Sequence, residues 1–326
     1  MMGAMPMPDL SENPRKPRRL HRGDTVGIVA TSGSWANRSE LLRGVAAIAA
    51  WGLKVKLGEH VNDRHGYLAG HDADRVADLH AMLADPNVDA IIAMRGGYGM
   101  SRLLPLLDQG LFAANPKAIC GFSDLTTLHL AAAAWGDVMS FYSIGATGIG
   151  SPTTSEFSKA SLQRALFSSE PYGLISPSPD DGYARGITGG RVSAPLAGGC
   201  SGVLISAIGT RLAPKLAGRI AVLEDVELEG AELDSNLTHL RNAGLLDGVV
   251  GIVVGDLRTK PTGGAIDNLS AEDIVEEVLG PLGVPILFGL PVGHGRHHFT
   301  VPFGAMATLD ADAGTLIVEE TVTSND

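Results

Sequence analysis

A serine, a glutamate and a histidine in three separate segments have the side chains that can activate a hydroxyl nucleophile. Ser123 ends the run "AICGFS", Glu224 ends the apolar run "RIAVLE", and His294 stands between two glycines in "PVGHGR". A serine hydroxyl becomes a nucleophile when a histidine takes its proton and an acid orients that histidine. These residues are therefore candidates for the catalytic groups of a hydrolase.

Ser123 also has a simpler interpretation as a helix cap. Residues 118–122 are predicted to form a buried strand, and the run after Asp124 has the spacing of an amphipathic helix. A serine or aspartate at such a junction commonly accepts a hydrogen bond from the first helical turn. The stretch alone favours a cap, although the same junction would also point a side chain into the crevice at the carboxyl end of a parallel sheet.

The acid and the base have their own alternatives. Strict alternation places Glu224 on the same strand face as Val222, where a carboxylate is costly unless a positive or hydrogen-bonding group meets it. His294 is followed closely by His297 and His298, which raises the possibility of a metal site. No H-E-x-x-H pattern and no carboxylate or cysteine companion accompanies them, so the sequence favours no metal.

A glycine-rich turn in "MRGGYGMSRLL" precedes a predicted helix. Its glycines allow close backbone approach and leave amide N–H groups free for an anion, although a plain strand-to-helix turn has the same composition. The spacing does not fit G-x-G-x-x-G, and no P-loop lysine is present, which disfavours a nucleotide. Arg95 in this turn could clamp a substrate carboxylate or pair with a carboxylate of the protein.

The elements that must position these residues alternate between strand and helix, which predicts an α/β protein with a parallel sheet. The expected strands of the first unit are 25–31, 53–58, 88–94, 118–122 and 138–144, and its expected helices are 38–51, 72–85, 99–108 and 124–135. We expect a flexible arm at 1–22, a nucleophile domain at 23–145, a linker at 146–190 and a C-terminal domain at 191–326. Within the linker only 157–168 has a helical pattern. The C-terminal domain is predicted to have strands at 219–226 and 249–257, helices near 231–244 and 270–279, and a terminal hairpin at 307–320.

Composition limits the possible partners. The chain has 326 residues, is 44% hydrophobic and carries a formal net charge of -11, which argues against nucleic acid as a partner. No apolar run is long enough for a membrane span, and the proline-broken basic N-terminus does not resemble a secretory signal. Two cysteines without C-x-x-C spacing fit a reducing compartment. We therefore expect a cytoplasmic protein that acts on small molecules.

Five blocks of the sequence resemble the LD-carboxypeptidase family of serine peptidases, which includes muramoyltetrapeptide carboxypeptidase and the microcin C immunity protein. They occur in the order typical of the family and span nearly all of residues 23–310. The blocks are "GDTVGIVATSG", "NVDAIIAMRGGYGMSRLLPLLD", "GFSDLTTLHLA", "IAVLEDVELEGAELDSNLTHLRNAGLLDGVVGIVVGDL" and "LPVGHGRHHFTVPFGAMATLD".

The resemblance implies a Ser-Glu-His triad on Ser123, Glu224 and His294, with oxyanion donors at the amides of Gly97 and Asp124. It also implies a flavodoxin-like N-terminal domain, a mixed α/β C-terminal domain, an active site between them and a homodimer. No metal or organic cofactor is implied. The triad would not form the nucleophile elbow of α/β-hydrolases, because a leucine stands where G-x-S-x-G requires its last glycine.

The implied substrate is a murein tetrapeptide from which terminal D-Ala is released, with Arg95 meeting its carboxylate. The sequence departs from the family at Cys200, which replaces an asparagine of the glycine-rich segment, and at His298, near another customary asparagine. Both could line the cleft and so affect substrate choice.

Two other functions stay open from the sequence. One is an immunity-type hydrolase that inactivates peptidyl-nucleotide antibiotics, and the other is a non-catalytic two-domain binding protein. Immunity-type members resemble a longer form with an added aromatic loop between serine and glutamate, whereas here that interval holds only Trp135 as tryptophan. This favours the wall peptide as substrate.

Overall fold

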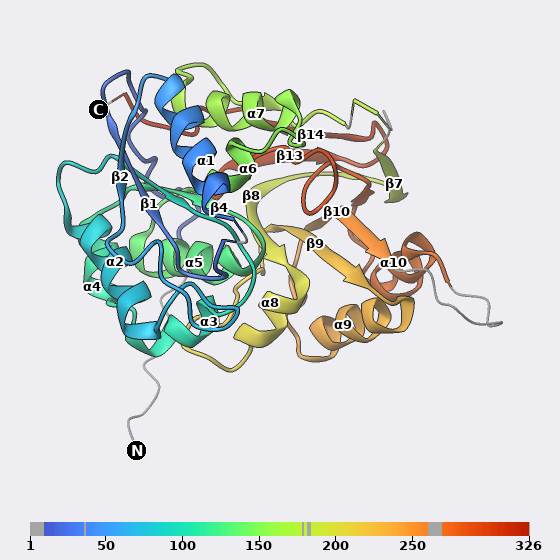
Figure 1. The fold of residues 1–326 in the computed structure, drawn as a ribbon. Helices are drawn as coiled ribbons and strands as arrows, with labels where there is room; N and C mark the ends of the chain where they lie inside the picture. Colours follow the sequence, from blue (N-terminus) through green and yellow to red (C-terminus); the bar gives the residue numbers. More distant parts are fainter. Residues whose placement is uncertain (1–9, 36, 178, 181–183, 260–268, 326) are drawn as a thin grey trace.

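Two β-sheets, one from each half of the chain, form the centre of the molecule (Figure 1). The structure is a computed structural model that describes residues 10–35, 37–177, 179–180, 184–259 and 269–325. The N-terminal half, in blue and green, supplies most of one sheet, and the C-terminal half, in yellow to red, supplies most of the other.

The first sheet has six strands in the order β12-β5-β4-β3-β1-β2. All neighbours are parallel except β12, which runs antiparallel to β5. Read from the other edge, the first five strands have the 2-1-3-4-5 order of a flavodoxin-like sheet, which confirms the expected fold of this half. The strands are β1 (Thr25–Val29), β2 (Lys54–Leu57), β3 (Ala90–Ala93), β4 (Ala118–Gly121), β5 (Ser140–Tyr142) and β12 (Val301–Phe303).

The four predicted helices of this half are present, two of them interrupted, and a further helix, α4 (Gln109–Ala114), was not predicted. The predicted helix at 99–108 is a short helix followed by a 3-10 turn at Leu104–Leu106, because Pro105 cannot continue a regular helix. The one at 124–135 consists of a 3-10 turn at Ser123–Leu125, a helix, and a π-turn at Ala132–Gly136. The helices are α1 (Arg38–Ala50), α2 (Asp72–Ala84), α3 (Met100–Leu103), α4 (Gln109–Ala114) and α5 (Thr126–Ala131).

The second sheet is mixed, as expected, with the order β6-β14-β13-β8-β9-β10-β11-β7. Strands β8 to β11 are parallel neighbours, and the remaining pairings are antiparallel. Its strands are β6 (Gly173–Leu174), β7 (Arg185–Thr188), β8 (Arg191–Cys200), β9 (Ile220–Leu228), β10 (Gly251–Thr259), β11 (Ile286–Phe288), β13 (Met306–Asp310) and β14 (Thr315–Val318). Its helices are α8 (Ser201–Ala207), α9 (Gly230–Asn242) and α10 (Ala271–Leu279).

The segment predicted as a linker, 146–190, carries regular structure. It holds α6 (Ala146–Ile149) and α7 (Glu156–Phe167), and its strands β6 and β7 form the two edges of the second sheet. Helix α6 packs on α1, so the segment joins the two halves through contacts on both sides. Strands of two and four residues are too short to leave a periodic pattern in the sequence.

The expected flexible arm, 1–22, is bound to the body of the protein over much of its described length. The Arg15 N–H donates to the Asp137 carbonyl at 2.8 Å, and the Leu20 N–H donates to the Leu166 carbonyl at 2.9 Å. Leu20 is 2% exposed, and the Arg18 guanidinium forms ion pairs with two aspartates. The basic cluster is therefore used in packing, which its charge alone did not predict. Within the described ranges, no helix has both the length and the apolar character needed to cross a bilayer.

Candidate active site

Ser123 follows strand β4 at a turn with an unusual backbone. Its φ is +64°, in the left-handed region that non-glycine residues rarely adopt. Among the described residues its side chain makes no capping hydrogen bond, and the neighbouring Asp124 carboxylate accepts the Met100 N–H at 2.8 Å, at the start of α3 and not in the helix that follows. The helix-cap interpretation of Ser123 is therefore wrong. Backbone strain of this kind is concentrated at functional sites, where the surrounding structure holds it.

The glycine-rich turn lies directly against the serine. A Cβ added at Gly96 would be 3.0 Å from the Ser123 Cβ and 3.3 Å from its Oγ, so a side chain there would crowd the serine. Among the described residues, the Gly97 N–H has no backbone or side-chain acceptor. The bond from Met100 to Asp124 ties the turn to the serine, and burial raises the pKa of the Asp124 carboxyl although the Met100 N–H counteracts it.

Glu224 and His294 form a hydrogen-bonded pair. The Glu224 side chain is fully buried on β9, and its Oε2 lies 2.8 Å from His294 Nδ1. Burial lowers the pKa of His294, but the hydrogen bond and charge of Glu224 outweigh it, so the pKa lies above its ordinary value. Gly293 is required beside them, because a Cβ there would lie 2.5 Å from Glu224 Oε2. The Glu224 carboxylate thus has the hydrogen-bonding partner that a carboxylate needs on a buried strand face.

The other histidines of the loop have separate partners and do not converge with His294. The buried His298 ring donates from Nδ1 to the Gly293 carbonyl at 2.7 Å, which braces the loop, and burial lowers its pKa. His297 lies 2.9 Å from Ser155 Oγ. Neither ring faces the Glu224–His294 pair as a further ligand would.

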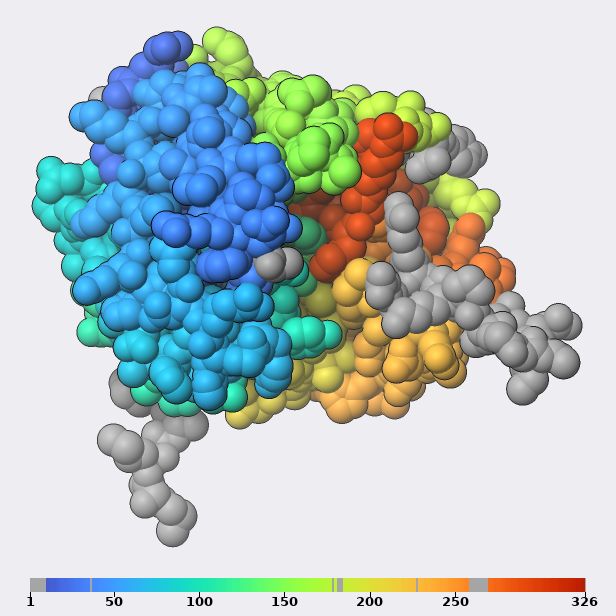
Figure 2. Space-filling model, viewed as in Figure 1, coloured from blue at the N-terminus to red at the C-terminus, as the bar shows by residue number. Residues whose placement is uncertain are grey.

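Two cavities meet at Ser123 and His294, in the hollow between the N-terminal and C-terminal halves visible in Figure 2. Their volumes are about 410 and 670 Å³. Arg95 and Gly97 line both. The smaller is also lined by Glu40, Arg43, Thr147, Ser151 and Thr154, and the larger by Tyr67, Tyr98, Asp124, Cys200 and Asp225. Six of the seven predicted site residues line these cavities, and the seventh, Glu224, is joined to them by its hydrogen bond to His294.

Arg95 and Cys200 differ in character. Arg95 donates to the Ser34 carbonyl at 3.3 Å and, within the described part of the chain, has no carboxylate partner. Cys200 is 6% exposed, beside Glu224 at the end of β8. Burial and the charges of Glu224 and Asp225 raise the pKa of its thiol well above the ordinary value, so Cys200 is a neutral wall of the cleft.

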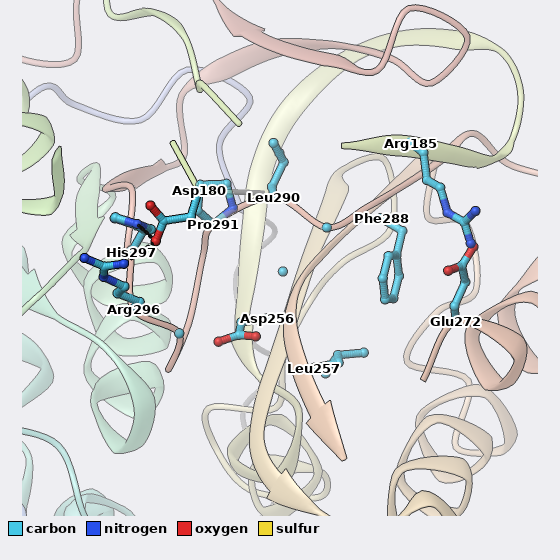
Figure 3. A pocket seen from close by; sticks show the side chains of 13 residues that line it. Asp180, Arg185, Asp256, Leu257, Glu272, Phe288, Leu290, Pro291, Arg296 and His297 are labelled. Atoms are coloured by element: carbon cyan, nitrogen blue, oxygen red, sulfur yellow. Dashed lines mark hydrogen bonds and ion pairs between the residues drawn. The ribbon is translucent and has the colours of Figure 1, made fainter. Parts of the chain in front are cut away.

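A third cavity, of about 540 Å³, lies beside the His294 loop at the carboxyl ends of β10 and β11 (Figure 3). Most of its charged lining residues are paired with one another: Arg185 with Glu272, and Arg296 and His297 with Asp180. Asp256 also lines this cavity. Ser123 does not line it, so this cavity is separate from the two that contain the serine.

Sequence reasoning missed Tyr142, which was predicted only as part of an apolar strand. Its hydroxyl donates to Glu224 Oε1 and accepts the Ser123 N–H at 3.0 Å. Ser123 and Glu224 therefore meet on one phenol. The signal in the sequence was a tyrosine at the end of β5, the strand next to β4, which leads to Ser123. A buried tyrosine hydroxyl usually has a hydrogen-bond partner.

The Ser123 hydroxyl and His294 face the same cavities, but the structure records no hydrogen bond between them among the described residues. Such bonds are often long until substrate binds. A strained serine, a histidine with a free second nitrogen and a buried carboxylate can together perform nucleophilic acyl transfer.

Comparison with known proteins gives consistent matches along the chain. The LD-carboxypeptidase N-terminal domain matches residues 26–143, and the LD-carboxypeptidase C-terminal domain matches residues 193–309. The murein tetrapeptide carboxypeptidase of Pseudomonas aeruginosa is 33% identical over 269 residues, which cover 80% of this chain and 85% of the relative. A Bacillus subtilis relative named "Probable murein peptide carboxypeptidase" is 32% identical over 93% of this chain and 94% of its own.

Solved structures agree. The muramoyltetrapeptide carboxypeptidase of Oxalobacter formigenes has a TM-score of 0.76 at 25% identity, over 90% of this chain and 97% of that one. The microcin C7 self-immunity protein MccF has a TM-score of 0.82 at 22% identity, over 95% of this chain and 100% of that one. The second likeness is one of fold.

Proposed function

This chain belongs to the LD-carboxypeptidase family, and from that premise we propose that it is a serine carboxypeptidase that releases terminal D-Ala from murein tetrapeptides. The observation that carries the proposal is the strained Ser123, which shares two cavities with a histidine already paired to a buried glutamate. The relatives named for murein peptides support the substrate.

In the proposed first half-reaction, His294 acts as the base. Because the Glu224 carboxylate can only accept, His294 carries its proton on Nδ1 and keeps the lone pair of Nε2 for the serine. The Ser123 Oγ loses its proton to Nε2 and attacks the carbonyl carbon of the scissile amide. The oxyanion is received by the amides of Gly97 and Asp124.

Collapse of the tetrahedral intermediate breaks the amide bond, and His294 returns its proton to the departing D-Ala nitrogen. A water molecule then attacks the acyl-enzyme with His294 again as base, and the peptide leaves with a new carboxylate. Glu224 orients the imidazole and offsets its positive charge throughout.

Arg95 is the proposed contact for the substrate carboxylate. It lines both cavities beside the oxyanion turn, and among the described residues no carboxylate of the protein occupies it. A free D-Ala carboxylate next to the scissile bond would form a charge-assisted contact with the guanidinium. Arg95→Ala is expected to raise KM more than it lowers kcat. Arg102→Ala is the matched control, because that arginine lines the larger cavity but is paired with Asp72.

The deciding assay offers the free murein tetrapeptide, an all-L analogue and a peptidyl-adenylate analogue to the enzyme under identical conditions. We expect D-Ala release from the tetrapeptide and little turnover of the other two. Cleavage of the peptidyl-adenylate analogue alone would mean that the substrate is of the immunity type and not the wall peptide. No turnover, together with failure of a phosphonofluoridate to label Ser123, would favour a binding protein.

The comparison with immunity-type proteins motivates the adenylate arm of this assay. Trp135, the tryptophan between the serine and the glutamate, is buried against Phe112 and lines neither active-site cavity. The exposed aromatic rings at the larger cavity are those of Tyr67 and Tyr98. This arrangement favours the peptide over a nucleobase that stacks on tryptophan.

Two further expectations from the family resemblance belong to the proposal: a homodimer and a place of work in the cytoplasm. Light scattering of the purified chain and fractionation of cells that express it would check them. A monomer at assay concentration would remove the first without affecting the chemistry.

A further inference from the structure

We propose that Tyr142 is a positioning residue that couples the backbone of the nucleophile to the acid of the triad, an inference that rests on the proposed function. The phenol oxygen receives the Ser123 N–H at 3.0 Å and donates its proton to Glu224 Oε1. The other oxygen of Glu224 receives His294 Nδ1 at 2.8 Å. A continuous line of hydrogen bonds therefore runs from the serine backbone to the base.

The direction of every bond in this line is fixed by chemistry. An amide N–H can only donate, so the tyrosine oxygen must accept from Ser123. The single phenolic proton is then free for Glu224, which as a carboxylate can only accept. The phenol stays protonated, because burial and the neighbouring Glu224 raise the pKa of Tyr142 well above its ordinary value.

The tyrosine acts on the serine by holding its strained backbone. A residue at φ +64° keeps that conformation only when its surroundings impose it. The Ser123 N–H is occupied by the phenol, so it is not available as an oxyanion donor, which leaves that role to Gly97 and Asp124. Loss of the hydroxyl would leave this N–H without its acceptor and would loosen the turn.

Tyr142 acts on the base through Glu224. A donated hydrogen bond stabilises the ionised carboxylate, and without it the Glu224–His294 pair holds its extra proton more tightly. The active form needs a neutral His294, so the acidic limb of the pH profile must then move to higher pH.

The location of Tyr142 separates positioning from substrate contact. Its side chain is fully buried on β5 and lines neither cavity that contains Ser123. It stands on the first sheet, whereas Glu224 stands on the second. The phenol thus joins the sheet of the nucleophile to the sheet of the acid.

The test is Tyr142→Phe, which keeps the ring and removes only the hydroxyl. We expect kcat to fall roughly tenfold to a hundredfold, the usual loss for one hydrogen bond to a charged group, with KM nearly unchanged. The acidic limb of kcat/KM should move to higher pH. The matched control is Tyr172→Phe, since Tyr172 is equally buried but donates to the Thr300 carbonyl at 2.7 Å, away from the site.

A double-mutant cycle with Glu224→Gln tests whether Tyr142 acts through Glu224. If Tyr142 acts through Glu224, removing its hydroxyl costs much less kcat in the Gln background than in the native protein. A purely structural role would give equal costs in both. Should Tyr142→Phe fail to fold, 3-fluorotyrosine at position 142 keeps the fold, has a more acidic phenol, and should move the acidic limb to lower pH.

The outcomes separate this inference from the proposed function. Full activity in Ser123→Ala would overturn the triad, and the role of Tyr142 with it. An inactive Ser123→Ala beside a Tyr142→Phe enzyme with native kcat and pH profile would overturn the positioning role alone. Equal losses in Tyr142→Phe and Tyr172→Phe would also overturn it.

Discussion

Ser123 is the residue on which the proposed chemistry depends most directly. Ser123→Ala removes the attacking oxygen, and by comparison with other serine hydrolases we expect kcat to fall roughly 10⁴-fold to 10⁶-fold with an unchanged melting temperature. Ser206→Ala is the control, because that serine lines the larger cavity and, among the described residues, its hydroxyl donates only to the Val203 carbonyl. D-Ala release measured for both variants decides the point. Native turnover by Ser123→Ala would disqualify the serine.

His294 sets the expected pH dependence. Its pKa lies above the ordinary 6.5, and the base works only when neutral, so activity is lost as pH falls through the raised value. A profile of kcat/KM should therefore have its acidic midpoint above pH 6.5. Glu224→Gln removes the negative charge that raises this pKa and should move the midpoint down. An acidic midpoint at or below 6.5 in the native enzyme would contradict the pairing.

The residues of the site were predictable to different degrees. Ser123 and Glu224 were recognisable because each follows an apolar run, and His294 because glycines flank it; the family blocks connect the three. Tyr142 was not, because its role depends on the distance between two sheets, which no local pattern records. The bracing role of His298 was hidden for the same reason, since its partners are backbone carbonyls.

At the scale of elements, His129 on α5 ties β4 to β5 and makes their junction sensitive to acid. Its Nε2 donates to the Gly121 carbonyl at 2.8 Å, and its Nδ1 accepts from the Ser140 hydroxyl at 2.8 Å. Burial lowers the pKa of this histidine to about 4. The folded protein therefore keeps His129 neutral in a pH range where the unfolded chain binds a proton.

The free energy of unfolding should accordingly fall as pH drops from about 6.5 to about 4, and His129 alone should account for a loss of roughly 3 kcal/mol across that window. Urea unfolding at several pH values measures it. His129→Gln, which can still donate to Gly121, should flatten the slope and leave only the part due to other groups, such as His298. An unchanged slope would contradict this assignment.

The longer elements could be predicted, and the short ones could not. The five parallel strands of the first sheet and its longer helices lie in segments whose apolar patterns extend over five or more residues of the sequence. Strands β6, β7 and β12 have two to four residues and are placed by pairing with distant segments. Residues 146–190 therefore read as a linker although they supply both edges of the second sheet.

For the whole molecule, the presence of β12, a strand from the C-terminal half, in the first sheet predicts cooperative unfolding. The strand comes from the C-terminal half and pairs with β5, so the first sheet is incomplete without the C-terminal half. The three tryptophans, Trp35, Trp51 and Trp135, all lie in the N-terminal half, whereas far-ultraviolet circular dichroism reports on both. We expect coincident urea transitions by the two signals. Two separated midpoints would show that the halves unfold independently.

The division of the site also determines when the enzyme becomes active during synthesis. More than half of the 326-residue chain separates Ser123 from His294, and β12 is later still. At a translation rate of ~5–20 residues per second, the turn that carries Ser123 is synthesised many seconds before His294. Throughout that time a nascent chain can hold the parallel strands β1 to β5 but lacks the proposed proton acceptor, because the last tenth of the 326 residues contains both His294 and the strand that completes the first sheet.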